Sequence, residues 1–437
     1  MIGYYLSLAL RNIRRHPATS ALMIFAIALG IGACMSIITV HYLMGADPIP
    51  HKSATLYHVQ LDSWDPNDGF GSDDEVPDQL TYRDASALLS ADRAYRQTVN
   101  TGTGFVIETD DPDIQPLLAS GRAVGADFFP MFDTPFLYGG PWSREQDDAV
   151  ELVVVLSREL NDELFGGGDS VGESLRLSGN TFRVVGVLDD WTMIPRFYDL
   201  TTGPFQEPDQ AYVPLSAMVD YELTNSGNVN CWKPSDESGW RAFLNSECIW
   251  LQMWVELPEP AQKAEFRQFM DDYVMQQKEL GRFQRPLRNQ LLNVTEWLQD
   301  QEVVQEEATM MLAVGIMFLL VCLLNTIGLL LSKFVARAPE IGLRRALGAT
   351  RQTLFAQYMV EAGAVGALGG LLGLLFTWLG LQGLERLFGE YLAELVNLNG
   401  TLVTMAIVLA VVASMLAGLY PTWRACNIAP AAQLKSQ

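Results

Sequence analysis

The stretch Lys333-Phe-Val-Ala-Arg-Ala-Pro-Glu-Ile-Gly-Leu-Arg-Arg-Ala-Leu-Gly-Ala-Thr-Arg351 is a short basic segment between two long apolar runs, and it decides the fold of the chain. The runs on either side, 308–332 and 362–384, contain no charged residue. A bilayer core is crossed by about 20 apolar residues, so each run is long enough to span a membrane. Because short loops rich in Lys and Arg stay on the cytoplasmic side, the segment is predicted to be a cytoplasmic loop.

The basic segment also carries the signals of a short helix. Pro339 suits the first turn of a helix, and Glu340 is favourable beside the positive helix end. Gly348 suits the position at which a helix stops. We therefore expect a short helix at the inner membrane surface, carrying Arg344 and Arg345, on which a soluble partner could push.

Hydropathy divides the whole chain of 437 residues, which exceeds the roughly 100–200 residues of one domain. Four runs without Asp, Glu, Lys or Arg are each long enough to span: 17–46, 308–332, 362–384 and 395–423. The first run is about twice the apolar length of a signal peptide, so we expect a retained anchor. The predicted fold class is a membrane protein with four transmembrane α-helices and a large extracytoplasmic α+β domain inserted between the first and second spans.

The charge of the chain is divided unevenly along its length. Residues 45–307 contain 46 acidic and 18 basic residues, whereas the rest of the chain contains 5 and 11. Arg11, Arg14 and Arg15 precede the first run, which predicts a cytoplasmic N-terminus, and four spans return the C-terminus to the same side. The acidic region 45–307 then lies outside, and its charge excludes nucleic acid as a partner.

Local signals in the external region predict an α+β domain. An alternating strand at 56–61 precedes an acidic loop at 62–78, and a buried strand at 151–157 precedes a short helix at 158–165. A tight turn at Gly179-Asn180 joins two strands of a hairpin.

Four other segments complete the prediction. Residues 3–16 form an amphipathic helix whose arginines can meet lipid phosphates at the membrane surface. Gly30 and Gly32 in the first span either admit a close neighbouring helix or are simply tolerated there. Residues 191–248 are predicted to be irregular. Residues 296–307 are acidic and helical, and are expected to continue into the second span as a stiff stalk.

Two groups of residues in the external region are candidate ligand sites. Four carboxylates of the acidic loop could bind calcium, but they lack the ligand order of an EF-hand, so a solvated loop is favoured. Four tryptophans could line a ligand groove, but packing of a loop-rich subdomain is favoured. The carboxylates are Asp65, Asp68, Asp73 and Asp74, and the tryptophans are Trp232, Trp240, Trp250 and Trp254.

The five cysteines fall into two environments. Cys34 and Cys322 lie in spans and Cys426 lies in the cytoplasmic tail. Cys231 and Cys248 lie in the external region, where an oxidising compartment permits a disulfide between them, and the sequence leaves their pairing open. No CxxC pair or HExxH motif indicates a metal site.

Four stretches together resemble the MacB/FtsX-like permeases of ABC transporters over nearly the whole chain. Ala9-Leu-Arg-Asn-Ile-Arg-Arg15 is similar to the N-terminal helix of that family, and 124–132 with 153–187 is similar to its periplasmic core domain. Glu340-Ile-Gly-Leu-Arg-Arg-Ala-Leu-Gly-Ala349 is similar to its coupling segment and is the most specific of the four. Residues 425–434 resemble its closing tail.

The resemblance implies a function as well as a fold. Permeases of this family work as dimers around ATPase subunits, and ATP-driven closure inside the cell moves their external domains, which is called mechanotransmission. The implied contact with the ATPase falls on ten residues: Glu340, Ile341, Gly342, Leu343, Arg344, Arg345, Ala346, Leu347, Gly348 and Ala349.

The expected partners follow from the resemblance and from one missing motif. No Gly-x-x-x-x-Gly-Lys-Ser/Thr sequence occurs, so ATP and Mg²⁺ are expected in a separate ABC ATPase dimer and no cofactor in this chain. A second permease, identical or similar, membrane lipid, and a periplasmic adaptor with an outer-membrane channel are the other expected partners. An enzyme is disfavoured, because the four histidines have no matched nucleophile in sequence reach.

Export of a substrate from the periplasm is the first functional hypothesis. The alternatives are activation of a periplasmic hydrolase or peptide sensing without transport, and extraction of lipoproteins from the inner membrane. The expected organisation, in a bacterial inner membrane with both termini cytoplasmic, is an amphipathic helix at 1–16, spans at 17–46, 308–332, 356–384 and 395–423, a periplasmic domain at 47–307, a coupling segment at 333–355, an external loop at 385–394 and a tail at 424–437.

Overall fold

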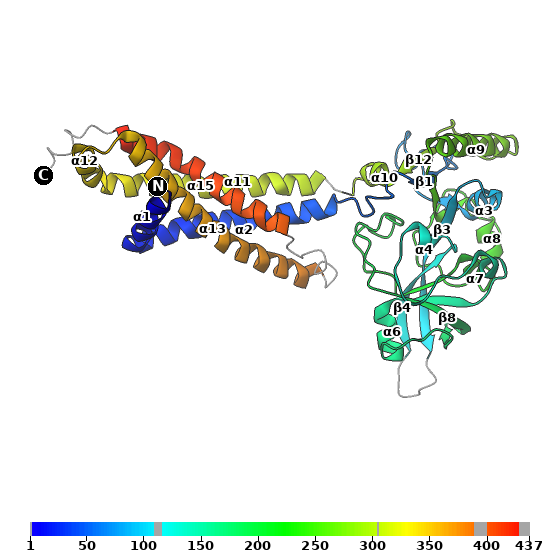
Figure 1. Cartoon of the computed structure of the whole chain (residues 1–437). Helices are drawn as coiled ribbons and strands as arrows, with labels where there is room; N and C mark the ends of the chain where they lie inside the picture. Colours follow the sequence, from blue (N-terminus) through cyan, green and yellow to red (C-terminus); the bar gives the residue numbers. More distant parts are fainter. Residues whose placement is uncertain (1, 109–115, 304–305, 389–399, 428–437) are drawn as a thin grey trace. The chain divides into compact units, whose positions relative to one another are not determined.

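The computed structural model describes residues 2–108, 116–303, 306–388 and 400–427 (Figure 1). The chain forms two compact units, which we describe separately. We call Met1–Gly45 with Val304–Gln437 the membrane unit, and Ala46–Val303 the head unit.

The described residues of the membrane unit form helices joined by short turns. Four of its helices contain segments long and apolar enough to cross a membrane: Pro17–Thr39, Met310–Ala336, Arg351–Gly383 and Val403–Asn427. The predicted fold class, with four spans and an α+β domain between the first and the second, is confirmed. The helices of the unit are α1 (Ile2–Arg15), α2 (Pro17–Met44), α11 (Glu306–Ala336), α12 (Ala338–Ala346), α13 (Arg351–Phe388) and α15 (Gly400–Asn427).

The ends of the spanning helices differ from the expected boundaries. Helix α13 begins at Arg351 rather than at residue 356, because the Thr350 hydroxyl accepts a hydrogen bond from the Thr353 amide at 3.2 Å and caps the first turn. Helix α15 continues to Asn427. Most of the expected external loop, from residue 389, and the tail from residue 428 lie outside the described residues.

Small residues allow the membrane helices to pack closely. A Cβ atom on Gly32 of α2 would lie 2.6 Å from the Phe376 Cβ of α13. A Cβ atom on Gly369 of α13 would lie 2.7 Å from the Ile27 side chain. Helix α13 thus lies against α2, and on another side it lies against α15 (Figure 1). Close approach, one of the two alternatives for Gly32, is what the packing shows.

The described strands of the head unit form one mixed sheet in the order β12-β1-β11-β3-β4-β9-β6-β8-β5. Strands β2 and β10 pair with β11, and β7 pairs with β3 and β8. The strands are β1 (Leu56–Gln60), β2 (Leu80–Thr81), β3 (Arg96–Glu108), β4 (Leu117–Val124), β5 (Phe136–Gly139), β6 (Val153–Leu156), β7 (Ser174–Leu177), β8 (Asn180–Leu188), β9 (Ala211–Pro214), β10 (Asn230–Cys231), β11 (Cys248–Glu256) and β12 (Gln290–Asn293).

Both faces of this sheet are buried at strand β11. Strand β11 is buried at every residue, and its alternating side chains enter two different cores, with Met253 and Val255 in one and Trp254 in the other. Residues of α3 and α9 belong to the first core, and residues of α4 and α10 belong to the second. The head helices are α3 (Tyr82–Ala91), α4 (Phe128–Met131), α5 (Arg144–Asp148), α6 (Arg158–Phe165), α7 (Leu215–Asp220), α8 (Trp240–Leu244), α9 (Pro260–Glu279) and α10 (Val294–Asp300).

Several local predictions can be compared with these elements. Helix α6 has the predicted bounds, with Ser157 as its N-cap and Gly166 at φ 68° after its last turn. The hairpin turn lies one residue earlier than predicted, because Ser178 and Gly179 adopt positive φ and Asn180 already belongs to β8. The prediction that 191–248 is irregular is incomplete, since β9, α7, β10 and α8 lie there.

The prediction of a continuous stalk from residue 296 into the second span is wrong. Helix α10 ends at Asp300, and Glu302 has φ 46°, which a right-handed helix does not permit. Helix α10 is held in the head core instead. The Trp297 indole donates a hydrogen bond to the Phe197 carbonyl at 3.0 Å, and its ring stacks on His58 with centroids 3.8 Å apart. Burial of this large side chain favours a docked helix over a free one.

Candidate coupling site

Helix α12 forms where the sequence signals predict it. Pro339 lies in the first turn and Glu340 follows it. At the other end Gly348 has φ 100°, its amide donates to the Arg345 carbonyl at 3.1 Å, and the Ala349 amide donates to the Arg344 carbonyl at 3.0 Å. This pair of bonds is a Schellman motif, which satisfies the last carbonyls of the helix and turns the chain.

One face of α12 is fastened to the other membrane helices. Ile341 is 3% exposed and packs in the helical core. Arg344 donates to Gln357 of α13 at 3.3 Å and pairs with Glu340, one turn earlier, at 2.6 Å. Arg345 donates to the Cys426 carbonyl of α15 at 3.4 Å. Displacement of α12 therefore acts on both α13 and α15.

The opposite face of α12 presents two apolar side chains. Leu343 is 62% exposed and Leu347 is 80% exposed. Residues four apart lie next to each other on a helix, so the two form one ridge. We call Leu343 and Leu347 the leucine ridge. An exposed apolar ridge on a helix whose other face is anchored is a surface that either a protein partner or lipid covers.

An ionic cluster lies next to the first turn of α12. The Lys333 ammonium donates to the Glu361 carboxylate at 2.6 Å, and an Arg337 nitrogen lies 3.7 Å from the other oxygen of the same carboxylate. Asn12 of α1 donates to that second oxygen at 3.0 Å. The side chains of Lys333, Arg337 and Glu361 are 2%, 7% and 3% exposed. We call these four residues the Glu361 cluster.

Sequence reasoning missed the Glu361 cluster, because Glu361 lies directly before the uncharged run 362–384 and was assigned no role. The signal that could have found it is a lone carboxylate in a spanning helix, which must face a cation or the protein interior. Of the ten residues predicted to contact an ATPase, the structure places seven, from Glu340 to Ala346, on α12 and three, from Leu347 to Ala349, in its closing turn.

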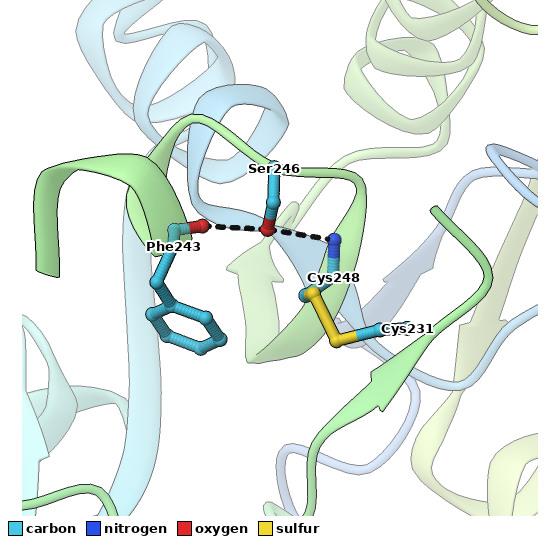
Figure 2. Close-up of a disulfide and its surroundings, with 4 residues drawn as sticks. All are labelled: Cys231, Phe243, Ser246 and Cys248. Carbon is cyan, nitrogen blue, oxygen red and sulfur yellow. Dashed lines mark hydrogen bonds between the residues drawn. A yellow bond between two sulfur atoms is a disulfide. The ribbon is translucent and has the colours of Figure 1, made fainter. Parts of the chain in front are cut away.

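The two external cysteines are joined in the structure. Cys231 and Cys248 form a disulfide with an S–S distance of 2.03 Å, and they face each other in the register of β10 and β11. Figure 2 shows how the Ser246 hydroxyl joins this bridge to α8, accepting from the Cys248 amide at 3.2 Å and donating to the Phe243 carbonyl at 2.6 Å. The bridge therefore ties the segment between the two cysteines to the first residue of β11.

The tryptophans and the acidic loop have structural partners. Trp250 and Trp254 are fully buried, Trp240 donates to the Val219 carbonyl at 2.8 Å, and Trp232 donates to the Ser63 carbonyl at 3.0 Å. These contacts pack the tryptophans against the rest of the head unit, which is the alternative favoured over a ligand groove. The acidic loop is fastened by arginines: Arg285 donates to the Asp73 carbonyl at 2.6 Å and to the Asp68 carbonyl at 3.1 Å, and Arg288 pairs with Asp74 at 2.8 Å.

Models of known protein families match parts of both units. The family model described as MacB-like periplasmic core domain matches residues 20–273, and the model described as FtsX-like permease C-terminal matches residues 312–430. The first of these matches covers more than half of the chain.

Similar proteins carry related names. The macrolide export ATP-binding/permease protein MacB of Bdellovibrio bacteriovorus is 24% identical over 305 residues, which are 68% of this chain and 41% of that protein. MacB of Escherichia coli K12 is 23% identical over 385 residues, 86% of this chain and 52% of that protein. The uncharacterized ABC transporter permease YvrN of Bacillus subtilis is 21% identical over 320 residues, 71% of this chain and 69% of that protein. The chain thus spans about half the length of the MacB proteins it matches.

Among solved structures, the periplasmic region of MacB from Actinobacillus actinomycetemcomitans matches with a TM-score of 0.37 and 15% identity, covering 58% of this chain and 95% of that one.

Proposed function

This chain belongs to the MacB/FtsX-like family of ABC transporter permeases, and we propose that it is a permease subunit that transmits ATP-driven movement from a separate ATPase to its head unit. ATP and Mg²⁺ bind in that ATPase, and a second permease, identical or similar, completes the complex. The protein is an inner-membrane protein with four spans, and both of its termini are cytoplasmic in this proposal.

The leucine ridge is the observation that carries this proposal. Leu343 and Leu347 leave apolar surface uncovered on a basic helix, while Ile341 and Arg344 on the other face hold that helix to its neighbours. A groove on the ATPase covers the ridge, and movement of the groove displaces α12. Because Arg344 and Arg345 contact α13 and α15, the displacement reaches the spanning helices.

The head unit receives the movement through packed contacts instead of a rigid rod. Residues at both of its chain ends, Ile49 and Val303, are buried in the same core as Trp297. Movement of the chain at either end therefore acts on one core of the head. In our proposal this rearrangement drives efflux of a substrate from the periplasm, through a periplasmic adaptor and an outer-membrane channel.

The decisive experiment places a charge on the ridge. The variant Leu343→Asp/Leu347→Asp is expected to reduce co-purification with the ATPase, and its stimulation by the permease, by about tenfold or more, as loss of a buried interface anchor does. Leu118→Asp in the head unit is the matched control, because Leu118 is also 80% exposed. Equal ATPase binding by both variants would exclude the ridge as the contact.

A second experiment addresses transport. Deletion of the chain is expected to lower export of at least one compound from the periplasm, and a point variant in the ridge should reproduce that loss. Unchanged export together with a bound wall hydrolase would favour hydrolase activation, and lipoproteins retained in the inner membrane would favour lipoprotein extraction.

A further inference from the structure

We propose that Glu361 is the positioning residue of α12, and that its carboxylate exchanges between Lys333 and Arg337 when α12 moves. The inference rests on the proposed function, because movement of α12 is what the exchange accompanies. It concerns residues that the leucine ridge does not include.

The first support is the spacing of the two cations. Lys333 lies in the last turn of α11 and Arg337 is the first residue after that helix, so the two cations are close together where α11 ends. Both approach the same carboxylate, Lys333 at 2.6 Å and Arg337 at 3.7 Å. One carboxylate thus lies between two cations, with one oxygen toward each, and a shift of about 1 Å is enough to change which cation it binds more tightly.

The second support is that the two cations are bound unequally. Lys333 makes a short, charge-assisted hydrogen bond to Glu361, whereas Arg337 lies beyond hydrogen-bond distance. Among the described residues the Arg337 side chain donates no hydrogen bond, although it is only 7% exposed. A mostly buried guanidinium gains from a closer carboxylate, so a shift of Glu361 toward Arg337 recovers there part of what it loses at Lys333.

The third support is the place of Arg337 in the chain. It is the residue before α12, and its carbonyl accepts a hydrogen bond from the Ile341 amide at 3.1 Å. Movement of α12 therefore moves Arg337 directly. Glu361 belongs to α13 and also accepts from Asn12 of α1, so exchange between the cations shifts α1 and α13 together relative to the end of α11. Shifts of about 1–2 Å between packed helices are a known form of conformational switch.

Two arrangements follow from this geometry. In the resting arrangement, which the structure contains, Glu361 pairs with Lys333. In the engaged arrangement, which the ATP-bound ATPase favours by displacing α12, Glu361 pairs with Arg337. Removing either cation biases the equilibrium toward the arrangement that uses the other.

The test uses the full-length permease with its ATPase in lipid nanodiscs. Lys333→Met is expected to raise the ATPase rate in the absence of substrate, and Arg337→Met is expected to lower the ATP-driven rate, each by roughly 2- to 30-fold. Opposite signs are the signature of exchange. Changes of the same sign, or no change, in assembled complexes would overturn the proposal, since a purely structural cluster responds alike to loss of either cation.

Milder variants keep the test valid if the methionine variants do not assemble. Lys333→Arg and Arg337→Lys keep both charges and change only reach and geometry, so opposite but smaller shifts are expected. Equal rates for the two variants would count against exchange.

A cross-link measures the step itself. The rings of Phe334 and Tyr358, on α11 and α13, have centroids 4.8 Å apart. In a chain with Cys34, Cys322 and Cys426 replaced by Ser, the pair Phe334→Cys/Tyr358→Cys is joined with a short bifunctional thiol reagent, and the yield of this cross-link should be lower when ATP is trapped than without nucleotide.

The same cross-link separates failure of this inference from failure of the proposed function. Adding Arg337→Met should preserve the cross-link in trapped ATP. If the yield of the cross-link does not change with nucleotide while the wild-type permease still stimulates its ATPase, the exchange alone is refuted. A wild-type permease that neither binds nor stimulates the ATPase refutes the proposed function, and with it the exchange.

Discussion

The head unit and the membrane unit each bury an ionic cluster, but the two clusters are balanced differently. In the head unit, Arg122 donates to Asp209 at 2.6 Å, to Asp199 at 2.8 Å and to Asn100 at 2.8 Å, and its side chain is 1% exposed. Arg196 lies 3.6 Å from Asp209, so two guanidinium groups face two carboxylates. We call Arg122, Arg196, Asp199 and Asp209 the Arg122 cluster.

In the membrane unit, one carboxylate faces two cations. Glu361 binds Lys333 closely and Arg337 loosely, which leaves positive charge uncompensated by the cluster itself. The contrast teaches that the same kind of interaction serves two purposes. A balanced cluster with several hydrogen bonds has one best arrangement and specifies the fold around it, whereas in our proposal a cluster short of one anion can change which cation it binds more tightly.

The largest expected effect comes from unbalancing the Arg122 cluster. Arg122→Met leaves Asp199 and Asp209 buried without their main cation, which should cost the head unit about 3–5 kcal/mol of unfolding free energy. Denaturant unfolding of the detergent-solubilised chain, followed by tryptophan fluorescence, measures it. The matched control is Arg176→Met, which removes an exposed pair with Glu108 and should cost about 1 kcal/mol or less. Equal losses in the two variants would show that burial of the cluster is unimportant.

The next effect concerns pH and a residue linked to the same cluster. His58 shares a hydrogen bond with Gln252 at 2.9 Å, and burial lowers the pKa of His58 to about 4, against the opposing effects of Gln252 and Asp199. The folded head therefore resists protonation of His58. The unfolding free energy of the head unit therefore falls by about 3 kcal/mol as the pH drops from 6.5 toward 4, because over this range the unfolded chain binds the His58 proton and the folded head does not.

Asp78 acts in the opposite direction over an overlapping range. Burial raises the pKa of Asp78 from 3.8 to about 6, so the folded state binds this proton more tightly and loses about 3 kcal/mol as the pH rises through that range. The two contributions offset each other between about pH 4 and 6. Asp78→Asn should therefore reveal a steep loss of stability on acidification, and His58→Gln should reveal a gain. Parallel pH profiles for both variants and the wild type would contradict this assignment.

The smallest expected effect tests packing in the membrane unit. Gly369→Ala places a methyl group 2.7 Å from the Ile27 side chain, which should cost about 1–3 kcal/mol because α2 and α13 must separate. Gly328→Ala is the matched control, since a Cβ atom there meets nothing within 4 Å. Thermal unfolding in detergent compares them. If Gly369→Ala loses as much stability as Arg122→Met, the Arg122 cluster is not more important to the head unit than helix packing is to the membrane unit.

Local signals predicted some elements closely, and the physical reason is short range. Helix α6 and helix α12 have the predicted bounds within a residue or two, because caps such as Ser157 and stops such as Gly348 act on hydrogen bonds within one turn. The spans were predicted because transfer of about 20 apolar residues depends on their sum and not on their neighbours. The prediction of a stalk failed because helix α10 is held by a contact between residues far apart in the sequence, the stacking of Trp297 on His58.

The amino-acid sequence by itself determined the four spans, the acidic α+β domain between the first two, the short helix α12 and the family, because each depends on composition or on contacts a few residues apart. The tertiary structure decided which charged side chains lie against each other. It placed Glu361 of α13 between Lys333 and Arg337 of a different helix, and Arg122 of β4 between Asp199 and Asp209. Charges separated by 24 to 87 residues can be matched only after the chain has folded, since burial and distance set their interaction and neither exists in the linear chain.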